Sequence, residues 1–192
     1  METTIQAVRT VDEIFELYLK FGQEEYGERV TMNMHMLQAA LLAEAEGSED
    51  EMILAAFLHD IGHFFEEAEK MGNYGAMAHD DIGAAYLLKK GFPLRMAKLV
   101  AGHVAAKRYL TAVSAEYNDT LSEASRQTLV YQGGPMTEKE INDFEADENY
   151  SDYIDIRVWD DKAKETGFAV LENDLARIKQ KMIKYLSNHL QS

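Results

Sequence analysis

The stretch FLHDIGHF, residues 57–64, sets His59 and Asp60 side by side near the end of an apolar run. The apolar residues before it have helical spacing, so we expect a helix that stops near Gly62. Adjacent residues on a helix point about 100° apart. His59 and Asp60 can therefore serve one common site only if that site lies beside the end of this helix.

Further potential metal ligands lie in other helical-looking segments on both sides of this stretch. Buried imidazoles and carboxylates are costly unless a charged partner satisfies them. One such histidine would be an ordinary core residue, but two metal ions bridged by Asp60 would satisfy the whole set. Ligands with only nitrogen and oxygen donors suit iron, manganese or zinc. The predicted ligands are His35, His59, Asp60, His79, His103 and Asp160.

The chain is predicted to be all-α, a single compact helical bundle over residues 1–192 with its motifs in about 26–165. Apolar periodicity, capping residues and the Gly and Pro positions mark the helix ends. Ser48 or Asp50 is expected to cap the helix that leads to His59, and Thr137-Glu138-Lys139-Glu140 has the form of a capping box. Residues 64–78 and 111–121 are expected to be loops. The other expected helices are 12–21, 31–46, 80–90, 93–108, 122–131, 150–164 and 173–190.

Composition narrows the possible partners and the compartment. The net charge of −15 argues against nucleic acid or an anionic membrane as a partner, although a pocket can still bind a small anion. With no cysteine, the chain has no disulfide, no zinc-thiolate site and no thiol nucleophile. No apolar run approaches the length of a membrane span, and the N-terminus has no export signal. We therefore expect a cytoplasmic protein, and the sequence leaves its oligomeric state open.

The order His35, His59-Asp60, Asp160 resembles the H…HD…D signature of the HD-domain superfamily, whose members are mostly metal-dependent phosphohydrolases. Longer stretches resemble one branch of it, the diiron oxygenases that cleave organophosphonates. These stretches are FLHDIGHF (57–64), GNYGAMAHDDIGAAYL (72–87), GHVAAKRYL (102–110), LSEASRQTLVYQGGPM (121–136) and RVWDDKAK (157–164).

The resemblance implies an HD-domain fold with two iron ions as a mixed-valent Fe(II)/Fe(III) pair and O2 as co-substrate. It assigns His35, His59 and Asp160 to the first iron. It assigns His79 and His103 to the second iron, with Asp60 as the bridge. Redox-silent zinc would not serve such chemistry. A plain hydrolase would need only Lewis acidity and a metal-bound water.

The resemblance also implies a set of residues that contact the substrate. Lys107 follows His103 by one helical turn, and Arg157 precedes Asp160 by three residues, so both lie on a ligand-bearing face. A lysine or arginine on a helix is more often a solvated surface charge. Ser125 and His63 complete the matching positions, His63 being near the metals without binding them. The predicted substrate contacts are Tyr26, Glu28, His63, Lys107, Ser125 and Arg157.

Tyr26 and Glu28 precede the first ligand, His35, in the stretch EEYGERV. In the family, the tyrosine can occupy the second iron until substrate arrives, and the glutamate faces the ammonium end of the substrate. Tyr26 lies one residue closer to the glutamate than in the enzyme for the primary amine. This departure and the aromatic side chains nearby favour a trimethylammonium group. The stretch could also be an ordinary exposed loop.

Three functions are compatible with these residues. The first is C–P bond cleavage of 1-hydroxy-2-(trimethylammonio)ethylphosphonate to glycine betaine and phosphate, with 2-amino-1-hydroxyethylphosphonate, giving glycine, as the alternative substrate. The second is a metal-dependent phosphohydrolase of the same superfamily. The third is a metal-stabilised helical module without catalytic activity. The sequence leaves open the substrate stereochemistry, the resting redox state and whether Tyr26 binds iron.

Overall fold

Helices form the architecture of the part of the chain that the computed structural model describes, residues 2–25, 29–65, 71–72 and 74–191. Within these residues there are ten α-helices and one 3-10 helix, which confirms the all-α prediction. They are α1 (Glu2–Phe21), α2 (Met32–Ala45), α3 (Asp50–Leu58), η1 (Ile61–Phe64), α4 (His79–Lys89), α5 (Leu94–Val113), α6 (Ala115–Thr120), α7 (Glu123–Tyr131), α8 (Glu138–Glu145), α9 (Tyr150–Lys162) and α10 (Glu172–His189).

Helix α3 is the centre of the core. Every residue from Met52 to Leu58 is buried, because α2, α5, α9 and α10 all pack against this helix. A helix that is apolar on all sides is stable in water only when it is enclosed in this way. The chain therefore delivers His59 and Asp60 directly into the interior at the end of α3.

Several predicted helix boundaries are confirmed by cap geometry. The Thr31 side chain accepts a hydrogen bond from the backbone N–H of Met34 at 3.3 Å and starts α2. Thr137 and Glu140 form the reciprocal capping box that starts α8. Gly47 follows α2 with a φ of +79°, a left-handed conformation that favours glycine.

Other boundaries differ from the prediction. Helix α3 ends at Leu58 rather than near Gly62, and its N-cap is Glu49, not Ser48 or Asp50. Helix α1 begins at Glu2, ten residues before the predicted start, because Ala7 and Val11 extend its buried stripe.

The predicted loop at 111–121 is wrong. Helix α5 continues to Val113, and α6 follows immediately. Ser114 separates the two helices, and its hydroxyl accepts a hydrogen bond from the backbone N–H of Tyr117 at 3.1 Å, which caps α6. This local cap starts a helix too short and too polar to give a periodic apolar signal.

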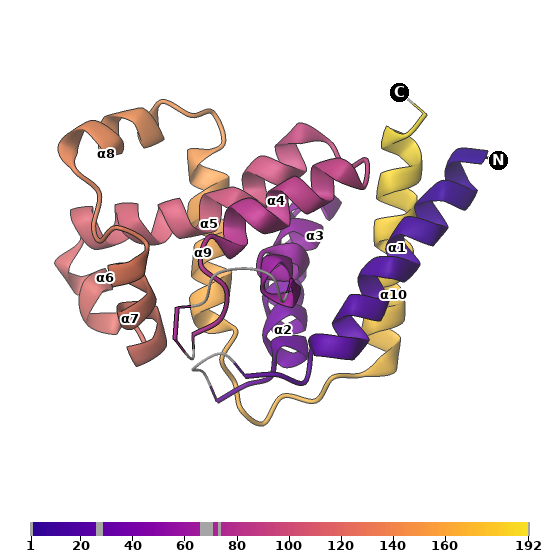
Figure 1. Cartoon of the computed structure of the whole chain (residues 1–192), viewed down its shortest axis with the longest axis horizontal. Helices are drawn as coiled ribbons and strands as arrows, with labels where there is room; N and C mark the ends of the chain where they lie inside the picture. Colours follow the sequence, from indigo (N-terminus) through magenta and orange to yellow (C-terminus); the bar gives the residue numbers. More distant parts are fainter. Residues whose placement is uncertain (1, 26–28, 66–70, 73, 192) are drawn as a thin grey trace.

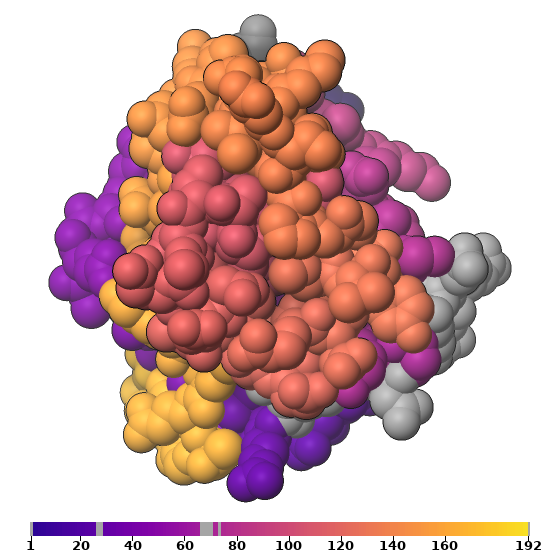
Figure 2. Space-filling view, turned by 90° about the vertical axis from the view of Figure 1, so that its left-hand side faces the viewer, coloured from indigo at the N-terminus to yellow at the C-terminus, as the bar shows by residue number. Residues whose placement is uncertain are grey.

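Helices α1 and α10 pack side by side along one flank, with the start of α1 and the end of α10 at the same end of the molecule (Figure 1). At the opposite flank, α6, α7 and α8 lie over α5 and α9, and their surface is seen face-on in Figure 2. Among the described residues, no helix is both long and apolar enough to cross a bilayer.

Candidate metal centre

His59 and Asp60 reach one site because the chain leaves the helix between them. His59 is the C-cap of α3 and is completely buried, and its Nδ1 donates to the carbonyl oxygen of Ala56 at 2.8 Å. Asp60 has φ −102° and ψ 9°, outside the helical region, and precedes the 3-10 helix η1. The turn aims the imidazole and the carboxylate at a common point beside the helix end, as the sequence predicted.

The structure brings the six predicted metal ligands together as two groups of three. The first metal group is His35 from α2, His59 from the end of α3, and Asp160 from α9. The second metal group is Asp60, His79 from the start of α4, and His103 from α5. Within each group, one potential ligand atom per residue lies within 4.8 Å of the other two.

Asp60 lies between the two groups and turns one oxygen toward each of them. Its Oδ2 is 3.4 Å from Nε2 of His35 and 3.3 Å from Nε2 of His59. Its Oδ1 is 3.4 Å from Nε2 of His79 and 3.6 Å from Nε2 of His103. This arrangement fits a carboxylate that bridges two ions.

All four histidines are oriented by backbone carbonyls, which can only accept hydrogen bonds. Each Nδ1 must therefore donate, which leaves the lone pair of a neutral ring on Nε2. The carbonyl oxygens belong to Ala163 for His35 (2.9 Å), Ala56 for His59 (2.8 Å), Ala76 for His79 (3.2 Å) and Val100 for His103 (2.7 Å).

The Nε2 atoms then face one another in pairs. Nε2 of His35 is 3.1 Å from Nε2 of His59, and Nε2 of His79 is 3.0 Å from Nε2 of His103. Two neutral imidazoles with lone pairs on these atoms cannot hydrogen-bond to each other, so each pair needs a proton or a metal ion at its Nε2 atoms. A cation beside each pair would satisfy both rings at once, so the residues present fit a two-metal centre.

The electrostatics of the cluster also call for added positive charge. Burial alone would lower the pKa of His35, but Asp160 and Asp60 beside it raise the pKa to about 10. Burial opposes the charge on Asp60, yet the surrounding histidines, His59 first, hold its pKa well below the usual range. Two carboxylates kept ionised in the interior attract whatever cation can reach them, which here is a proton or a metal ion.

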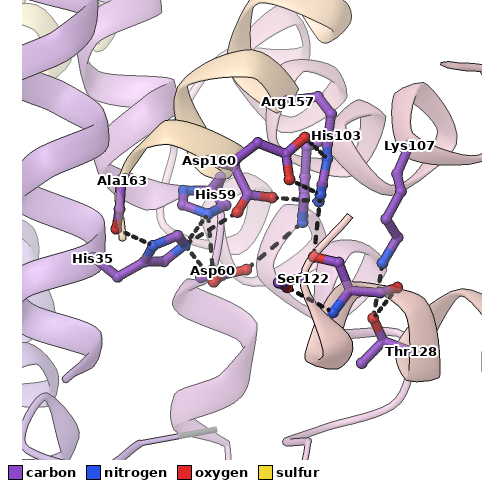
Figure 3. Close-up of polar contacts among 12 residues, drawn as sticks. His35, His59, Asp60, His103, Lys107, Ser122, Thr128, Arg157, Asp160 and Ala163 are labelled. Atoms are coloured by element: carbon purple, nitrogen blue, oxygen red, sulfur yellow. Dashed lines mark hydrogen bonds and ion pairs between the residues drawn. The ribbon is translucent and has the colours of Figure 1, made fainter. Parts of the chain in front are cut away.

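A wall of cationic and hydroxyl side chains faces the two metal groups across one cavity. Lys107 is 3% exposed, and its ammonium donates to Oγ1 of Thr128 at 2.9 Å (Figure 3). Burial first, and then the nearby Arg157, lowers the pKa of Lys107 to about 7. Ser125 accepts from the Lys164 ammonium at 3.3 Å. Lys107, Ser125 and Arg157 thus lie where the sequence predicted, beside the metal groups.

Arg157 connects this wall to the first metal group. Its Nη1 donates to Oδ2 of Asp160 at 2.6 Å, while Oδ1 of Asp160 lies 3.3 Å from Nε2 of His35 (Figure 3). Its Nη2 donates to Oγ of Ser125 at 3.3 Å. Burial raises the pKa of the Asp160 carboxyl, but the charge of Arg157 and a hydrogen bond from His35 bring it well below the usual range.

His63 lies next to the second metal group without joining it. Its ring stacks on His79 with centroids 4.0 Å apart, and its Nδ1 accepts from the backbone N–H of Ala76 at 2.9 Å. Its Nε2 is 3.9 Å from Oδ1 of Asp60. Burial, followed by the charge of His79, lowers its pKa well below the usual range, so the ring is neutral.

Two predicted substrate contacts, Tyr26 and Glu28, lie outside the described residues. Conversely, the sequence analysis assigned no role to Thr128 or Lys164, both of which line the cavity. The spacing of each residue from a predicted site residue could have indicated that it lies at the site. Thr128 lies one helical turn after Ser125, and Lys164 lies four residues after Asp160.

Comparisons with known proteins agree with this geometry. The HD-domain family matches residues 33–132. An uncharacterised protein of Acanthamoeba polyphaga mimivirus is 43% identical over 186 residues, which span 95% of this chain and 84% of the relative.

Two relatives carry the names of phosphonate oxygenases. The glycine-betaine-forming 1-hydroxy-2-(trimethylamino)ethylphosphonate dioxygenase of Leisingera caerulea is 43% identical over 157 residues, 80% of each chain. The hydroxymethylphosphonate dioxygenase of Gimesia maris is 40% identical over 163 residues, 83% of this chain and 81% of the relative. The resemblance inferred from the sequence motifs is thereby confirmed. The chain belongs to the HD-domain family, in the group that includes these phosphonate dioxygenases.

Proposed function

We propose that this protein is a dioxygenase that cleaves the C–P bond of an α-hydroxyphosphonate with O2. One observation carries the proposal: two metal-ligand groups share Asp60 and face a wall of three cationic side chains across the same cavity. A paired metal centre without an anion site would fit many reactions. The cations of Lys107, Arg157 and Lys164 add a site suited to a phosphonate dianion.

We propose that the two groups hold iron, with Asp60 as the bridging ligand. The donors are imidazole nitrogens and carboxylate oxygens, which suit iron, and the chain has no thiolate to favour a softer ion. When bound as an Fe(II)/Fe(III) pair, the metals would supply Lewis acidity and the redox capacity that O2 chemistry requires. With Asp60 as the bridge, the first ion would have four protein ligands and the second three, which leaves room for substrate and O2.

The proposed reaction balances without another co-reactant. The α-hydroxyphosphonate R–CH(OH)–PO3²⁻ and one O2 give the carboxylate R–COO⁻, HPO4²⁻ and one proton. The C–P and C–H bonds of the hydroxylated carbon break, that carbon is oxidised to the carboxylate level, and O2 takes up the four electrons. No external reductant is consumed.

The residues of the chain would bind and orient the substrate. Arg157 and Lys107 would neutralise the phosphonate, and the Ser125 hydroxyl, between Arg157 and Lys164, would fix its rotation. Thr128 would hold the Lys107 ammonium in place. His63, neutral and stacked on His79, would donate a hydrogen bond from Nε2 to the substrate without adding charge.

The cavity also supports a substrate with a bulky, weakly hydrated cation. It is lined by Val30, Met32, Met71 and Tyr74, which offer apolar and aromatic surface. A trimethylammonium group makes favourable contacts with such surface and needs no hydrogen-bond acceptor. We therefore propose 1-hydroxy-2-(trimethylammonio)ethylphosphonate as the substrate, with Tyr26 and Glu28 as further predicted substrate contacts. The primary-amine analogue and hydroxymethylphosphonate are the alternatives.

Phosphate release from the iron-loaded, partly reduced protein tests this function. The three α-hydroxyphosphonates are offered with and without O2, and a simple phosphomonoester is offered in parallel. We expect phosphate only with O2, fastest from the trimethylammonio compound. Faster release from another phosphonate would overturn the substrate choice. O2-independent phosphate release from the phosphomonoester, with none from the phosphonates, would make the protein a phosphohydrolase instead.

A further inference from the structure

Arg157 is almost completely enclosed, at 3% exposure, and its guanidinium is shared between two carboxylates on its own helix. Asp160 takes a hydrogen bond from Nη1 at 2.6 Å. Asp161 takes bonds from the other edge, with Oδ2 3.0 Å from Nε and Oδ1 in contact with Nη2. Asp160 is a predicted metal ligand, whereas nothing so far assigns a role to Asp161.

Tyr117 completes the contact with this outer edge of the guanidinium. Its hydroxyl donates to Oδ2 of Asp161 at 2.6 Å and accepts from Nε of Arg157 at 2.8 Å. Tyr117 comes from α6, and Asp161 comes from the last turn of α9. The hydroxyl therefore links the two helices at the point where Arg157 enters the cavity. Asp161 also lies 3.8 Å from the Lys164 ammonium.

The guanidinium has a planar fork that prefers to bind one carboxylate with two parallel hydrogen bonds. Without a competing partner, Arg157 would be free to bind Asp160 in this way and draw both carboxylate oxygens toward itself. In the structure, Asp161 accepts from Nε and from one side of Nη2, and this prevents Arg157 from making both hydrogen bonds to Asp160. Oδ1 of Asp160 then faces His35, and the rest of Nη2 reaches Ser125.

We propose that Asp161 and Tyr117 are positioning residues that hold Arg157 in this orientation, so that one guanidinium serves both Asp160 and the phosphonate. The assignment rests on the proposed function, because it takes a phosphonate as the ligand beside Ser125. Neither residue needs to touch substrate or metal, and neither lines the cavity in the described part of the chain.

The direction in which Asp161→Asn changes the phosphate affinity shows whether Asp161 positions Arg157 or acts only through its own charge. Asp161 is an anion close to a site that binds an anion. If it acted only through its charge, the Asp161→Asn variant would bind phosphate more tightly, because a repulsion is removed. If it positions Arg157, the same variant binds phosphate more weakly, because the guanidinium turns away from Ser125.

The test measures the affinity for inorganic phosphate, by calorimetry on the iron-loaded protein without O2, and the iron content per chain. We expect Asp161→Asn to weaken phosphate binding about tenfold, equivalent to about 1.4 kcal/mol. Tyr117→Phe should weaken it in the same direction by a smaller factor. With the phosphonate substrate, KM should rise more than kcat falls. Unchanged or tighter phosphate binding in Asp161→Asn would overturn the proposal.

Matched variants and a double-mutant cycle exclude a general loss of structure. Asp152→Asn removes another carboxylate of α9, one that pairs with Arg95 of α5. Tyr109→Phe removes a hydroxyl that donates to Glu145 at the surface. Neither should change the phosphate affinity. Since Asp161 acts through Arg157, adding Asp161→Asn to Arg157→Gln should produce no further loss. The positioning role would be contradicted if Asp152→Asn lost as much phosphate affinity as Asp161→Asn. It would also be contradicted if the losses from Asp161→Asn and Arg157→Gln were fully additive.

The phosphate and iron measurements do not depend on turnover. If the wild-type protein released no phosphate from any phosphonate, the proposed function would fail, and the KM comparison would be lost with it. The phosphate affinities would still show whether Asp161 holds Arg157. If Asp161→Asn does not fold, Tyr117→Phe decides the question, because this substitution removes only the hydroxyl that contacts Asp161 and Arg157.

Discussion

At the scale of single residues, the backbone prepares the side chains of this centre before any ligand arrives. Carbonyl oxygens fix the Nδ1 proton of His35, His59, His79 and His103, so that Nε2 is the atom left on each ring to bind a metal ion. Lys107 is also prepared for a ligand, but by burial. Its ammonium lies where water solvates it poorly, so its charge is stabilised only when an anion binds beside it. The oriented histidines and the buried lysine both lower the stability of the protein without ligands, and both reduce the rearrangement needed when metal ions and an anion bind.

The depressed pKa of Lys107 predicts a pH dependence of stability. Its pKa is about 7 in the folded chain against 10.5 when unfolded, so between these values only the unfolded chain binds the proton. Stability therefore rises with pH across this window. At pH 7, the free energy of unfolding of Lys107→Met should exceed that of the wild type by on the order of 2 kcal/mol, so the variant should unfold at a higher temperature. This difference in stability should shrink toward pH 9.

Thermal unfolding of both proteins at pH 7, 8 and 9, in phosphate-free buffer, measures this difference. Lys98→Met is the matched control, because Lys98 lies on the same helix and is 42% exposed where it pairs with Asp147. A constant gap between Lys107→Met and the wild type at all three pH values would contradict the prediction.

At the scale of secondary elements, close approaches of the backbone place the second metal group. The 3-10 helix η1 packs directly against the start of α4, which carries His79. A Cβ atom added at Gly62 would lie 1.8 Å from the His79 carbonyl oxygen. Only glycine permits this contact, which explains the Gly in the stretch that follows His59 and Asp60.

Gly62→Ala should therefore push α4 away from η1 and move His79. Because the first metal group draws no ligand from α4, we expect the variant to lose the second metal more readily than the first. Destabilisation of about 3 kcal/mol is expected from the backbone displacement. Iron per chain and the unfolding midpoint provide the measurement.

The control for this substitution is Gly167→Ala, where an added Cβ atom meets nothing within 4 Å. It should leave both the iron content and the midpoint unchanged. Two irons per chain retained in Gly62→Ala would show that α4 can shift without moving His79, against the expectation.

At the scale of the whole molecule, the metal centre connects helices that are far apart in the chain. Its predicted ligands come from α2, the end of α3, α4, α5 and α9, so bound ions would tie together most of the core. Asp160 is part of the first metal group although it lies beyond residues 33–132, the segment matched by the family. The ions would thus fasten α9, with Arg157 and Asp161, to the rest of the fold.

Removal of metal should consequently lower the stability of the entire chain. A ligand present at 100 times its dissociation constant stabilises the folded state by about 2.7 kcal/mol. For a protein of this size, we expect a chelator to lower the melting temperature by roughly 5–10 °C. Calorimetry before and after chelation, and again after iron is restored, measures the shift.

Asp60→Ala offers the internal check on this measurement. It removes the carboxylate that faces both metal groups, so the variant should contain less iron and respond less to the chelator. An equal melting temperature of the wild type with and without metal would mean that the cluster does not bind ions that stabilise the fold.

Local sequence signals determined most of the fold and predicted the residues that the structure gathers into the two metal groups. Thr31, Gly47, Pro93 and the capping box at Thr137 each act within one helical turn, so their effects can be predicted without the rest of the chain. The buried apolar run before His59 likewise requires enclosure by other helices. The wrong prediction of a loop at 111–121 also has a local cause. Helix α6 has too few residues and too little apolar surface for a helical period to be recognised in its sequence.

The tertiary structure decided which atoms meet. The sequence predicted Asp60 as a bridge without showing which oxygen serves which ion, whereas the fold turns Oδ2 toward the first metal group and Oδ1 toward the second. Tyr117 and Asp161 are separated by 44 positions, and their hydrogen bond depends on how α6 and α9 both pack on α5. Residue types and helical periods are properties of short segments. Contacts between distant side chains depend on helix packing, and only the folded chain contains that information.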